Sequence, residues 1–311
     1  MKQTAIGVDI GGSHVSCAAC DIAGQTLLGD TSAGSSLDNH APADEIIDVW
    51  GKTLQTTIEK AGKQNVAGIG FAMPGPFDYV KGIPLFTGAN QKYENLYGVD
   101  VPGALREYLD LPGDFPIRFI NDATAFAIGE DWMGNAKGFV RSLCITLGTG
   151  FGSAFLKDGL PVVRGVKVPE MGCLYHLPFD EGTADDYFST RGLVDRYKKL
   201  TGKEVDGARE IAEAAPVDAA AREVFRDFGV RLVELLKPWI RKFGVEVLVI
   251  GGNISNAFDA FGPALKDALE LENLNVSVLT SYLQESAAIA GSARLVDESF
   301  WQRVAPLLGD M

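Results

Sequence analysis

The sequence predicts an α/β fold made of two copies of one domain with a cleft between them, and three observations support this prediction. Apolar, β-rich runs alternate with runs of helical spacing. The same order of elements occurs twice along the chain, and each copy begins with two strands that meet at a glycine-rich corner. The length of 311 residues also exceeds what a single hydrophobic core usually supports.

The first copy consists of three strands, a helix and a fourth strand. The strands are apolar, β-rich runs bounded by glycine or proline, as at Gly24 and at Pro74-Gly75-Pro76. The helix carries apolar residues three and four positions apart. The expected strands are 4–10, 14–22, 25–33 and Val66–Met73, and the expected helix is 42–62.

The second copy repeats this order of elements. The expected strands are 142–147, 152–156 and 245–250, and helical patterns cover 184–201, 207–214, 217–243, 258–271 and 285–297. No linker of distinct composition separates the copies. We place the first domain at residues 1–120 and the second at 121–293. We expect a final helix, at about 294–311, to pack back on the first domain.

Charge and composition favour a soluble globular protein of the cytoplasm. The formal net charge of −13 repels nucleic acid and anionic lipid, so we expect neither as a partner. No run reaches transmembrane length, and the N-terminus lacks a signal-peptide pattern. Cys17 and Cys20 have a C-x-x-C spacing, but residues three apart on a strand point to opposite faces. We therefore expect buried structural thiols rather than a metal or redox pair.

Three glycine-rich corners at strand ends are candidates for phosphate or nucleotide binding. They are Asp9-Ile10-Gly11-Gly12-Ser13, Gly148-Thr149-Gly150 and Gly251-Gly252. Glycines let backbone amides approach a phosphate, and a nearby aspartate can hold magnesium through water. Each corner alone is also consistent with a tight turn or a simple strand end. The second corner is not a Rossmann fingerprint, because a strand follows it, and the chain has no P-loop motif.

Together with two further motifs, these corners resemble the ROK family, which comprises bacterial sugar kinases and related repressors of the actin/hexokinase superfamily. The resemblance extends from residue 4 to about residue 293. It implies duplicated actin-like ATPase domains of ribonuclease H-like topology, ATP and Mg²⁺ as cofactors, a sugar substrate and a homodimer. The motifs that carry it are 9–13, 70–76 with Asp78 and Gly82, 121–123, 148–152 and Gly251-Gly252.

The resemblance implies a role for each corner. The first corner binds phosphate, and its aspartate positions Mg²⁺ through water. The second corner also binds phosphate, and the third lines the adenosine site. The residues concerned are Asp9, Gly11, Gly12 and Ser13 in the first corner, Gly148, Thr149 and Gly150 in the second, and Gly251 and Gly252 in the third.

Asn121-Asp122 follows a strand at 117–120 and precedes a helix of small residues. The resemblance makes Asn121 a sugar contact and Asp122 the catalytic base. Phosphoryl transfer to an alcohol needs a carboxylate that accepts the hydroxyl proton, which fits Asp122. The alternative is that Asp122 only caps the helix. Asn95 resembles a further sugar contact, and a turn asparagine on the surface is its alternative.

One segment departs from the family pattern of Glu-x-Gly-His, a cysteine-rich zinc loop and a later glutamate. This chain has Glu170-Met171-Gly172-Cys173 and no cysteine in 177–186. Cys173 and His176 alone cannot complete a four-ligand site, so we expect no structural zinc. Glu170 keeps a position suited to a sugar hydroxyl, and Asp185 aligns with the later glutamate, so the resemblance makes both residues expected sugar contacts. A lone histidine such as His176 is more often a packing or surface residue.

We therefore expect an ATP-dependent sugar kinase that acts on a hexose or amino-hexose, with Asp122 as general base. Two alternatives stay open. A catalytically silent sugar-binding regulator is consistent with the altered loop. The repressors of the family carry a DNA-binding segment before their first strand, whereas the first strand begins here at residue 4, so we do not expect direct DNA binding. A sugar-independent ATPase of the same superfamily would be indifferent to sugars.

Overall fold

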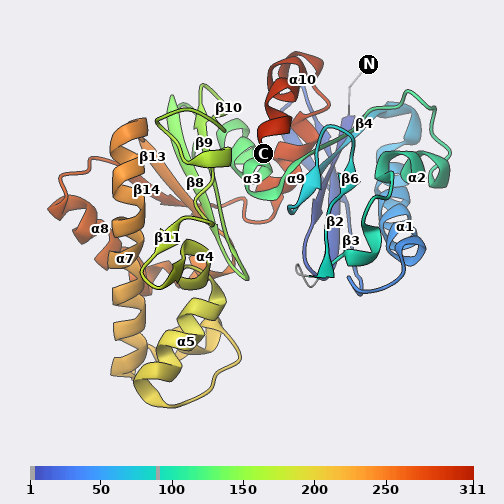
Figure 1. Cartoon of the computed structure of the whole chain (residues 1–311). Coiled ribbons are helices and arrows are strands. Elements are labelled where there is room, and N and C mark those ends of the chain that lie inside the picture. Colours follow the sequence, from blue (N-terminus) through green and yellow to red (C-terminus); the bar gives the residue numbers. More distant parts are fainter. Residues whose placement is uncertain (1–3, 89–91) are drawn as a thin grey trace. The chain divides into compact units, whose positions relative to one another are not determined.

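A computed structural model describes residues 4–88 and 92–311, and the chain divides into two compact units (Figure 1). Unit 1 comprises Met1–Gly134 and Glu285–Met311, and unit 2 comprises Asn135–Gln284. Unit 2 is therefore one continuous stretch of chain, whereas unit 1 is assembled from two stretches.

The limits of the units differ from the boundaries near residues 120 and 293 that the sequence suggested. Helix α3 (Asp122–Trp132) and helix α9 (Ser286–Arg294) pack against each other. Helix α9 also packs on the sheet of unit 1. Both helices therefore belong to unit 1, although the sequence pattern had placed them in the second domain.

Unit 1 is built on a five-stranded sheet. Its strands are β1 (Thr4–Ile10), β2 (His14–Asp21), β3 (Thr26–Ser36), β4 (Val66–Met73) and β7 (Ile117–Asn121). Their order across the sheet is β3-β2-β1-β4-β7. Strand β2 is antiparallel to both of its neighbours, β1 and β3, whereas β1, β4 and β7 run parallel to one another.

Helix α1 (Ala43–Ala61) contacts β2 and β3 and carries the periodic apolar residues expected from the sequence. Its Trp50 is fully buried, with ring centroids 6.5 Å from Phe71 of β4 and 5.9 Å from Tyr93. Burial of such large aromatic side chains is a major source of stability for a core. This cluster therefore fixes α1 and the segment around Tyr93 on the sheet.

Helix α9 approaches β1 and β4 at backbone distance. A Cβ atom at Gly7 of β1 would overlap the carbonyl oxygen of Ile289, and one at Gly70 of β4 would overlap that of Ser292. The Ser292 hydroxyl also accepts a hydrogen bond from Val8 N at 3.1 Å. Glycine is required at both strand positions, because any side chain would push the helix off the sheet.

Unit 2 contains a second five-stranded sheet. Its strands are β8 (Arg141–Leu147), β9 (Phe151–Lys157), β10 (Leu160–Pro161), β13 (Val247–Gly251) and β14 (Ser277–Thr280). Their order is β10-β9-β8-β13-β14, with β8 antiparallel to β9 and parallel to β13. Each strand matches the strand at the same place in unit 1, so the prediction of a duplicated α/β domain is confirmed.

The helices of unit 2 are α4 (Ala184–Tyr187), α5 (Thr190–Thr201), α6 (Ala208–Ala214), α7 (Ala219–Phe243) and α8 (Phe258–Leu271). The sequence predicted one helix over 184–201, which is wrong. The chain breaks at Phe188 and Ser189, because Phe188 enters the core 5.7 Å from the ring of Phe151 while Ser189 is extended. No helix in the described part of either unit combines the length and apolarity needed to cross a membrane.

Several short elements were not predicted. They are α2 (Val101–Tyr108), the ribbon β5 (Phe77–Asp78) with β6 (Ile83–Pro84), and the hairpin β11 (Pro178–Phe179) with β12 (Gly182–Thr183). The short helix α10 (Glu298–Val304) lies within the final helix expected at about 294–311. Tertiary contacts hold such elements. For example, the Arg118 guanidinium of β7 lies 4.5 Å from the Trp301 ring of α10 and 2.6 Å from Glu298.

Cys17 and Cys20 are free and buried on opposite faces of β2. Cys17 Sγ lies 3.1 Å from Thr57 Oγ1 of α1, whereas Cys20 packs in a cluster with Trp132 of α3. Burial raises the pKa of Cys17 to about 11 and that of Cys20 to about 12, so both remain thiols. The prediction of buried structural thiols is confirmed.

Candidate functional site

The parallel strands of unit 1 bring Asp9 and the pair Asn121-Asp122 to one edge of the sheet. Asp9 lies near the end of β1, and Asn121 is the last residue of β7. Because β1, β4 and β7 run in the same direction, their carboxyl ends meet at the same edge. Ligands of α/β proteins commonly bind at such an edge.

Asn121, rather than Asp122, caps helix α3. Its Oδ1 accepts a hydrogen bond from Thr124 N at 3.1 Å, and its Nδ2 donates to Asp122 Oδ1 at 2.9 Å. Asp122 Oδ1 also accepts from Ala123 N at 2.8 Å. The second oxygen, Asp122 Oδ2, has no hydrogen bond to any residue that the structure describes. Asp122 is thus oriented by two donors and keeps one oxygen for another proton donor.

Asp9 lies in an acidic environment. Burial, followed by the charges of Asp122 and Glu285, raises the pKa of Asp9 from its ordinary value of 3.8 to about 7. No positively charged group is among the causes of this shift in pKa. A buried carboxylate with carboxylate neighbours is a good oxygen donor for a hard divalent cation, which would offset the repulsion. The donor chemistry around Asp9 therefore fits Mg²⁺.

The first glycine corner, residues 11–13, joins β1 to β2 and is held by two side chains. Tyr93 Oη donates to Gly11 O at 2.6 Å, and Asn39 Nδ2 donates to Gly12 O. The last two corner residues, Gly12 and Ser13, are exposed, and their N–H groups have no hydrogen-bond partner within residues 4–88 and 92–311. The carbonyl groups are therefore fixed while two amide donors remain available for an anion.

Asn95 lies in an exposed segment after Tyr93. Its Nδ2 donates to His40 O at 2.7 Å and to Ala41 O at 3.1 Å. These bonds fasten the turn that precedes α1 and use both hydrogens of the amide group. Only its carbonyl oxygen could contact a sugar, so the predicted sugar role stays a prediction.

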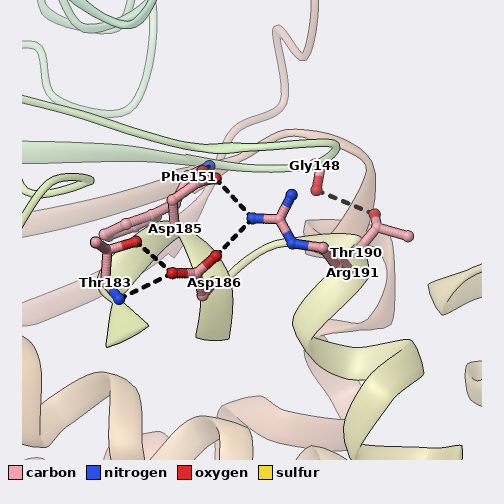
Figure 2. Close-up of polar contacts among 7 residues, drawn as sticks. All are labelled: Gly148, Phe151, Thr183, Asp185, Asp186, Thr190 and Arg191. Atoms are coloured by element: carbon pink, nitrogen blue, oxygen red, sulfur yellow. Dashed lines mark hydrogen bonds and ion pairs between the residues drawn. The ribbon is translucent and has the colours of Figure 1, made fainter. Parts of the chain in front are cut away.

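Figure 2 shows the second glycine corner, residues 148–151, between β8 and β9. Thr190, the first residue of α5, donates to Gly148 O from its N at 2.8 Å and from its Oγ1 at 3.0 Å. Asp185 Oδ1 of α4 accepts from Phe151 N at 2.7 Å. The N–H groups of Thr149 and Gly150, between these two contacts, have no hydrogen-bond partner in the described chain. This corner therefore also presents amide donors.

Asp185 belongs to a small charged cluster beside this corner. Arg191 Nη2 lies 3.2 Å from Asp185 Oδ2 and 2.9 Å from Asp186 Oδ1 (Figure 2). Asp186 Oδ2 accepts from Thr183 N and Oγ1, and these donors, followed by Arg191, lower the pKa of Asp186. Both oxygens of Asp185 are therefore engaged with protein groups, and its predicted contact with sugar stays a prediction.

The third corner, Gly251-Gly252, ends β13 beside the end of β8. Gly251 pairs with Thr146 in the parallel ladder. Gly252 has a φ of 79°, and a Cβ atom there would overlap the backbone of Leu147. Only glycine satisfies both conditions. The second and third corners, which are far apart in the sequence, thus lie at the ends of the neighbouring strands β8 and β13.

The segment that departs from the family pattern forms a short 3₁₀ turn, Glu170–Gly172, in which Glu170 is exposed. Cys173 Sγ lies 3.7 Å from His176 Nδ1. Burial, followed by the charge of Glu170, raises the pKa of Cys173 to about 12, which keeps it a thiol. The described residues contain no group of three or more His, Cys, Asp or Glu placed to hold a metal ion.

Several residues that shape these corners carried no signal in the sequence. Asn39, Tyr93 and Thr190 act through hydrogen bonds to corner carbonyl groups, and Glu285 acts through its charge on Asp9. Each comes from a segment that is distant in sequence from its partner. No local motif could therefore have identified them.

Comparisons with known proteins identify the family of this chain. Residues 5–299 match the ROK family. The chain is 27% identical over 330 residues to the glucokinase of Thermotoga maritima, over 96% of this chain and 98% of that protein. It is 26% identical over 285 residues to the N-acetyl-D-glucosamine kinase of Haemophilus influenzae, over 85% and 88%.

A solved structure also resembles this fold. A ROK family glucokinase from Streptomyces griseus, in complex with glucose and AMPPNP, superposes with a TM-score of 0.72 at 22% identity, over 94% of this chain and 98% of that one. The duplicated mixed sheets are those of the actin-like ATPase fold predicted above. The family match spans nearly the whole chain, and we conclude that this chain belongs to the ROK family.

Proposed function

We propose that the chain is an ATP-dependent sugar kinase that phosphorylates a hydroxyl group of a hexose or amino-hexose. Membership of the ROK family supports this proposal, as do the relatives named as kinases of glucose and of N-acetyl-D-glucosamine. The solved relative with glucose and AMPPNP supports ATP as the phosphoryl donor.

The arrangement of Asp122 is the single observation that carries the proposal. Two donors, Asn121 Nδ2 and Ala123 N, hold Oδ1, and Oδ2 has no hydrogen bond within the described chain. A general base needs a fixed carboxylate with an oxygen able to accept a proton. A cap would instead accept from backbone donors two or three residues ahead, and Asn121 already fills that role.

In the proposed reaction, Asp122 accepts the proton of a sugar hydroxyl as that oxygen attacks the γ-phosphorus of ATP. We infer the primary hydroxyl of a pyranose as the acceptor. The new bond joins the sugar oxygen to phosphorus, and the bond from phosphorus to the β–γ bridging oxygen breaks. ADP leaves with the electron pair of that bond. Little covalent chemistry is required of the protein beyond positioning, charge stabilisation and this proton transfer.

The nucleotide would be bound by backbone groups and by Asp9. Asp9 would hold Mg²⁺ through water, and bound Mg²⁺ supplies neutralisation of the phosphate charge. The free amide donors of corners 11–13 and 148–151 would bind phosphate oxygens. Gly251 and Gly252 would line the adenosine site. Backbone donors allow a chain with a net charge of −13 to bind an anion without a basic patch.

The sugar would be bound by Asn121, Glu170 and Asn95. Asn121 Nδ2 already donates to Asp122, which would couple the position of the base to the position of the sugar. Glu170 is exposed and has an acceptor carboxylate for a hydroxyl group. The free oxygen of the Asn95 amide would accept from another hydroxyl group. Cys173 stands where the family has histidine, so this segment would distinguish the sugar of this chain from those of its relatives.

We expect the protein in the cytoplasm and as a homodimer. The four cysteines of the chain are all free, which suits a reducing compartment. Size-exclusion chromatography with light scattering would measure the assembly.

The proposal is tested by ADP release from Mg-ATP with a panel of hexoses and N-acetylhexosamines. At least one sugar should stimulate turnover. Asp122→Ala should then lower kcat by about a hundredfold to ten-thousandfold, the usual contribution of a general base. Asp122→Asn is the matched variant, because it preserves the shape of the side chain and removes its basicity.

Other results would favour the alternatives. A sugar that binds without turnover would indicate a sensor, and ADP release that is indifferent to every sugar would indicate a plain ATPase. Normal turnover by a folded Asp122→Asn protein would exclude Asp122 as the base.

A further inference from the structure

We propose that Asp185 and Thr190 are positioning residues that hold the second glycine corner in the conformation that binds the phosphates of ATP. This inference rests on the proposed function, and it assigns Asp185 to the nucleotide rather than to the sugar. The two side chains reach the two ends of the corner, with Thr190 at Gly148 and Asp185 at Phe151 (Figure 2).

The corner has little structure of its own. Its single internal hydrogen bond runs from Gly148 N to Gly150 O at 3.1 Å. Glycine-rich segments populate many backbone conformations, so their geometry is set by external contacts. Thr190 supplies two such contacts at Gly148 O, at 2.8 and 3.0 Å, and Asp185 supplies one at Phe151 N, at 2.7 Å. These bonds fix the ends and leave the intervening amide groups ready for an anion, which lowers the entropy lost on binding.

The charges of the cluster require a further residue. Asp185 and Asp186 place two carboxylates beside a corner that would receive phosphate, and like charges repel. Arg191 contacts both carboxylates, at 3.2 and 2.9 Å, and offsets part of their charge. Arg191 therefore allows these two carboxylates to lie beside the corner without preventing an anionic ligand from binding there. Because all three side chains are partly exposed, this effect should weaken as salt concentration rises.

The element that carries Asp185 is itself held on another side. Arg231 of α7 pairs with Asp180 and lies over the rings of Phe179 and Tyr187, 5.0 Å from each centroid. This stack ties the β11–β12 hairpin and α4 to the long helix α7. The segment that carries Asp185 is therefore held in place by α7, so Asp185 can keep the corner in one conformation.

The experiment compares Asp185→Ala with Glu181→Ala as the matched control. Glu181→Ala removes an exposed negative charge from the β11–β12 hairpin and leaves the bond from Phe151 N to Asp185 intact. We expect Asp185→Ala to raise the KM for ATP and the Kd for AMPPNP about tenfold, from the loss of one charge-assisted hydrogen bond. The KM for the sugar should change less than about twofold, as should both constants in the control.

Two milder variants keep the test decisive if Asp185→Ala fails to fold. Asp185→Asn retains an oxygen that can accept from Phe151 N, so its nucleotide affinity should fall less than that of the alanine variant. Thr190→Val removes only the Oγ1 bond and should weaken AMPPNP about threefold to fivefold, and Thr190→Ser should restore it.

The inference is overturned if Asp185→Ala raises the KM for the sugar and leaves AMPPNP affinity unchanged, because Asp185 would then be a sugar ligand. It is also overturned if AMPPNP does not bind the wild-type protein, or if neither Asp185→Asn nor Thr190→Val alters its affinity. AMPPNP binding is measured without sugar. If the wild type phosphorylates no sugar but Asp185→Ala loses AMPPNP affinity, the proposed function fails and this inference stands.

Discussion

Replacing Asp9 by asparagine should stabilise unit 1 while it removes the predicted Mg²⁺ ligand. Burial, followed by the charges of Asp122 and Glu285, raises the pKa of Asp9 from 3.8 to about 7. The folded state therefore holds the proton of Asp9 more tightly than the unfolded state does. Ionisation of Asp9 lowers the free energy of unfolding progressively as the pH rises from 3.8 to about 7. At about 1.4 kcal/mol for each pH unit, the loss reaches at most about 4 kcal/mol above that range.

The assay is urea unfolding of the wild type and of Asp9→Asn between about pH 5 and about pH 8. Tryptophan fluorescence reports mainly on unit 1, because Trp50, Trp132 and Trp301 belong to it. Asparagine has nearly the same shape and no charge, so it escapes the loss that ionisation causes. The variant should be more stable than the wild type by a margin that widens by about 2–3 kcal/mol over this pH range. Mg²⁺-dependent turnover should fall in the same variant.

The matched control is Asp30→Asn, since Asp30 lies exposed on β3 of the same sheet. The free energy of unfolding of Asp30→Asn should differ little from that of the wild type, and this difference should not increase with pH. A margin for Asp9→Asn that stays constant from about pH 5 to about pH 8 would refute the reasoning, because the environment of Asp9 would then not disfavour its charge.

Three further substitutions test the corners and the base. Gly252→Ala should destabilise unit 2 by about 2–4 kcal/mol in urea unfolding, because alanine combines strain at a φ of 79° with an overlap at the Leu147 backbone. Asn121→Ala should lower stability by about 1 kcal/mol through loss of the cap and should lower kcat about tenfold or more. Tyr93→Phe leaves Gly11 O without its donor and should raise the KM for ATP about fivefold to tenfold.

Each of these substitutions has its own control. Gly113→Ala introduces a side chain into open space and should be nearly neutral, so equal effects would contradict the account of Gly252. Asn121→Ser keeps an uncharged acceptor for the cap but loses the amide donor to Asp122, and it should recover stability without recovering kcat. Tyr97→Phe removes an exposed hydroxyl, and a similar rise in KM would show that the Tyr93 hydroxyl has no special role.

The sequence was sufficient for features that depend on local pattern. Strand periodicity with glycine-rich ends located all three corners, and the duplication predicted two related sheets. The pair Asn121-Asp122 was found because it directly follows a strand. These signals are local, since a strand end and its turn are encoded within a few residues.

The sequence was insufficient where distant segments decide the structure. Thr190 fell within a predicted continuous helix, and its contact with Gly148 exists only because Phe188 enters the core and interrupts that helix. Tyr93 and Glu285 reach the corner at β1 through tertiary folding alone. Helical spacing cannot reveal such breaks, because burial of one aromatic residue outweighs local helix propensity.

The backbone contact of α9 with β1 and β4 determines the order in which the chain can fold. Gly7 and Gly70 lie in the first quarter of the sequence, whereas Ile289 and Ser292 come near its end. During synthesis from the N-terminus, the part of the sheet in unit 1 that α9 covers must stay uncovered until that helix is made. Unit 2 is continuous and can complete its core earlier. The domain that begins first therefore finishes last, and its contacts of long sequence separation should make it the slower unit to fold.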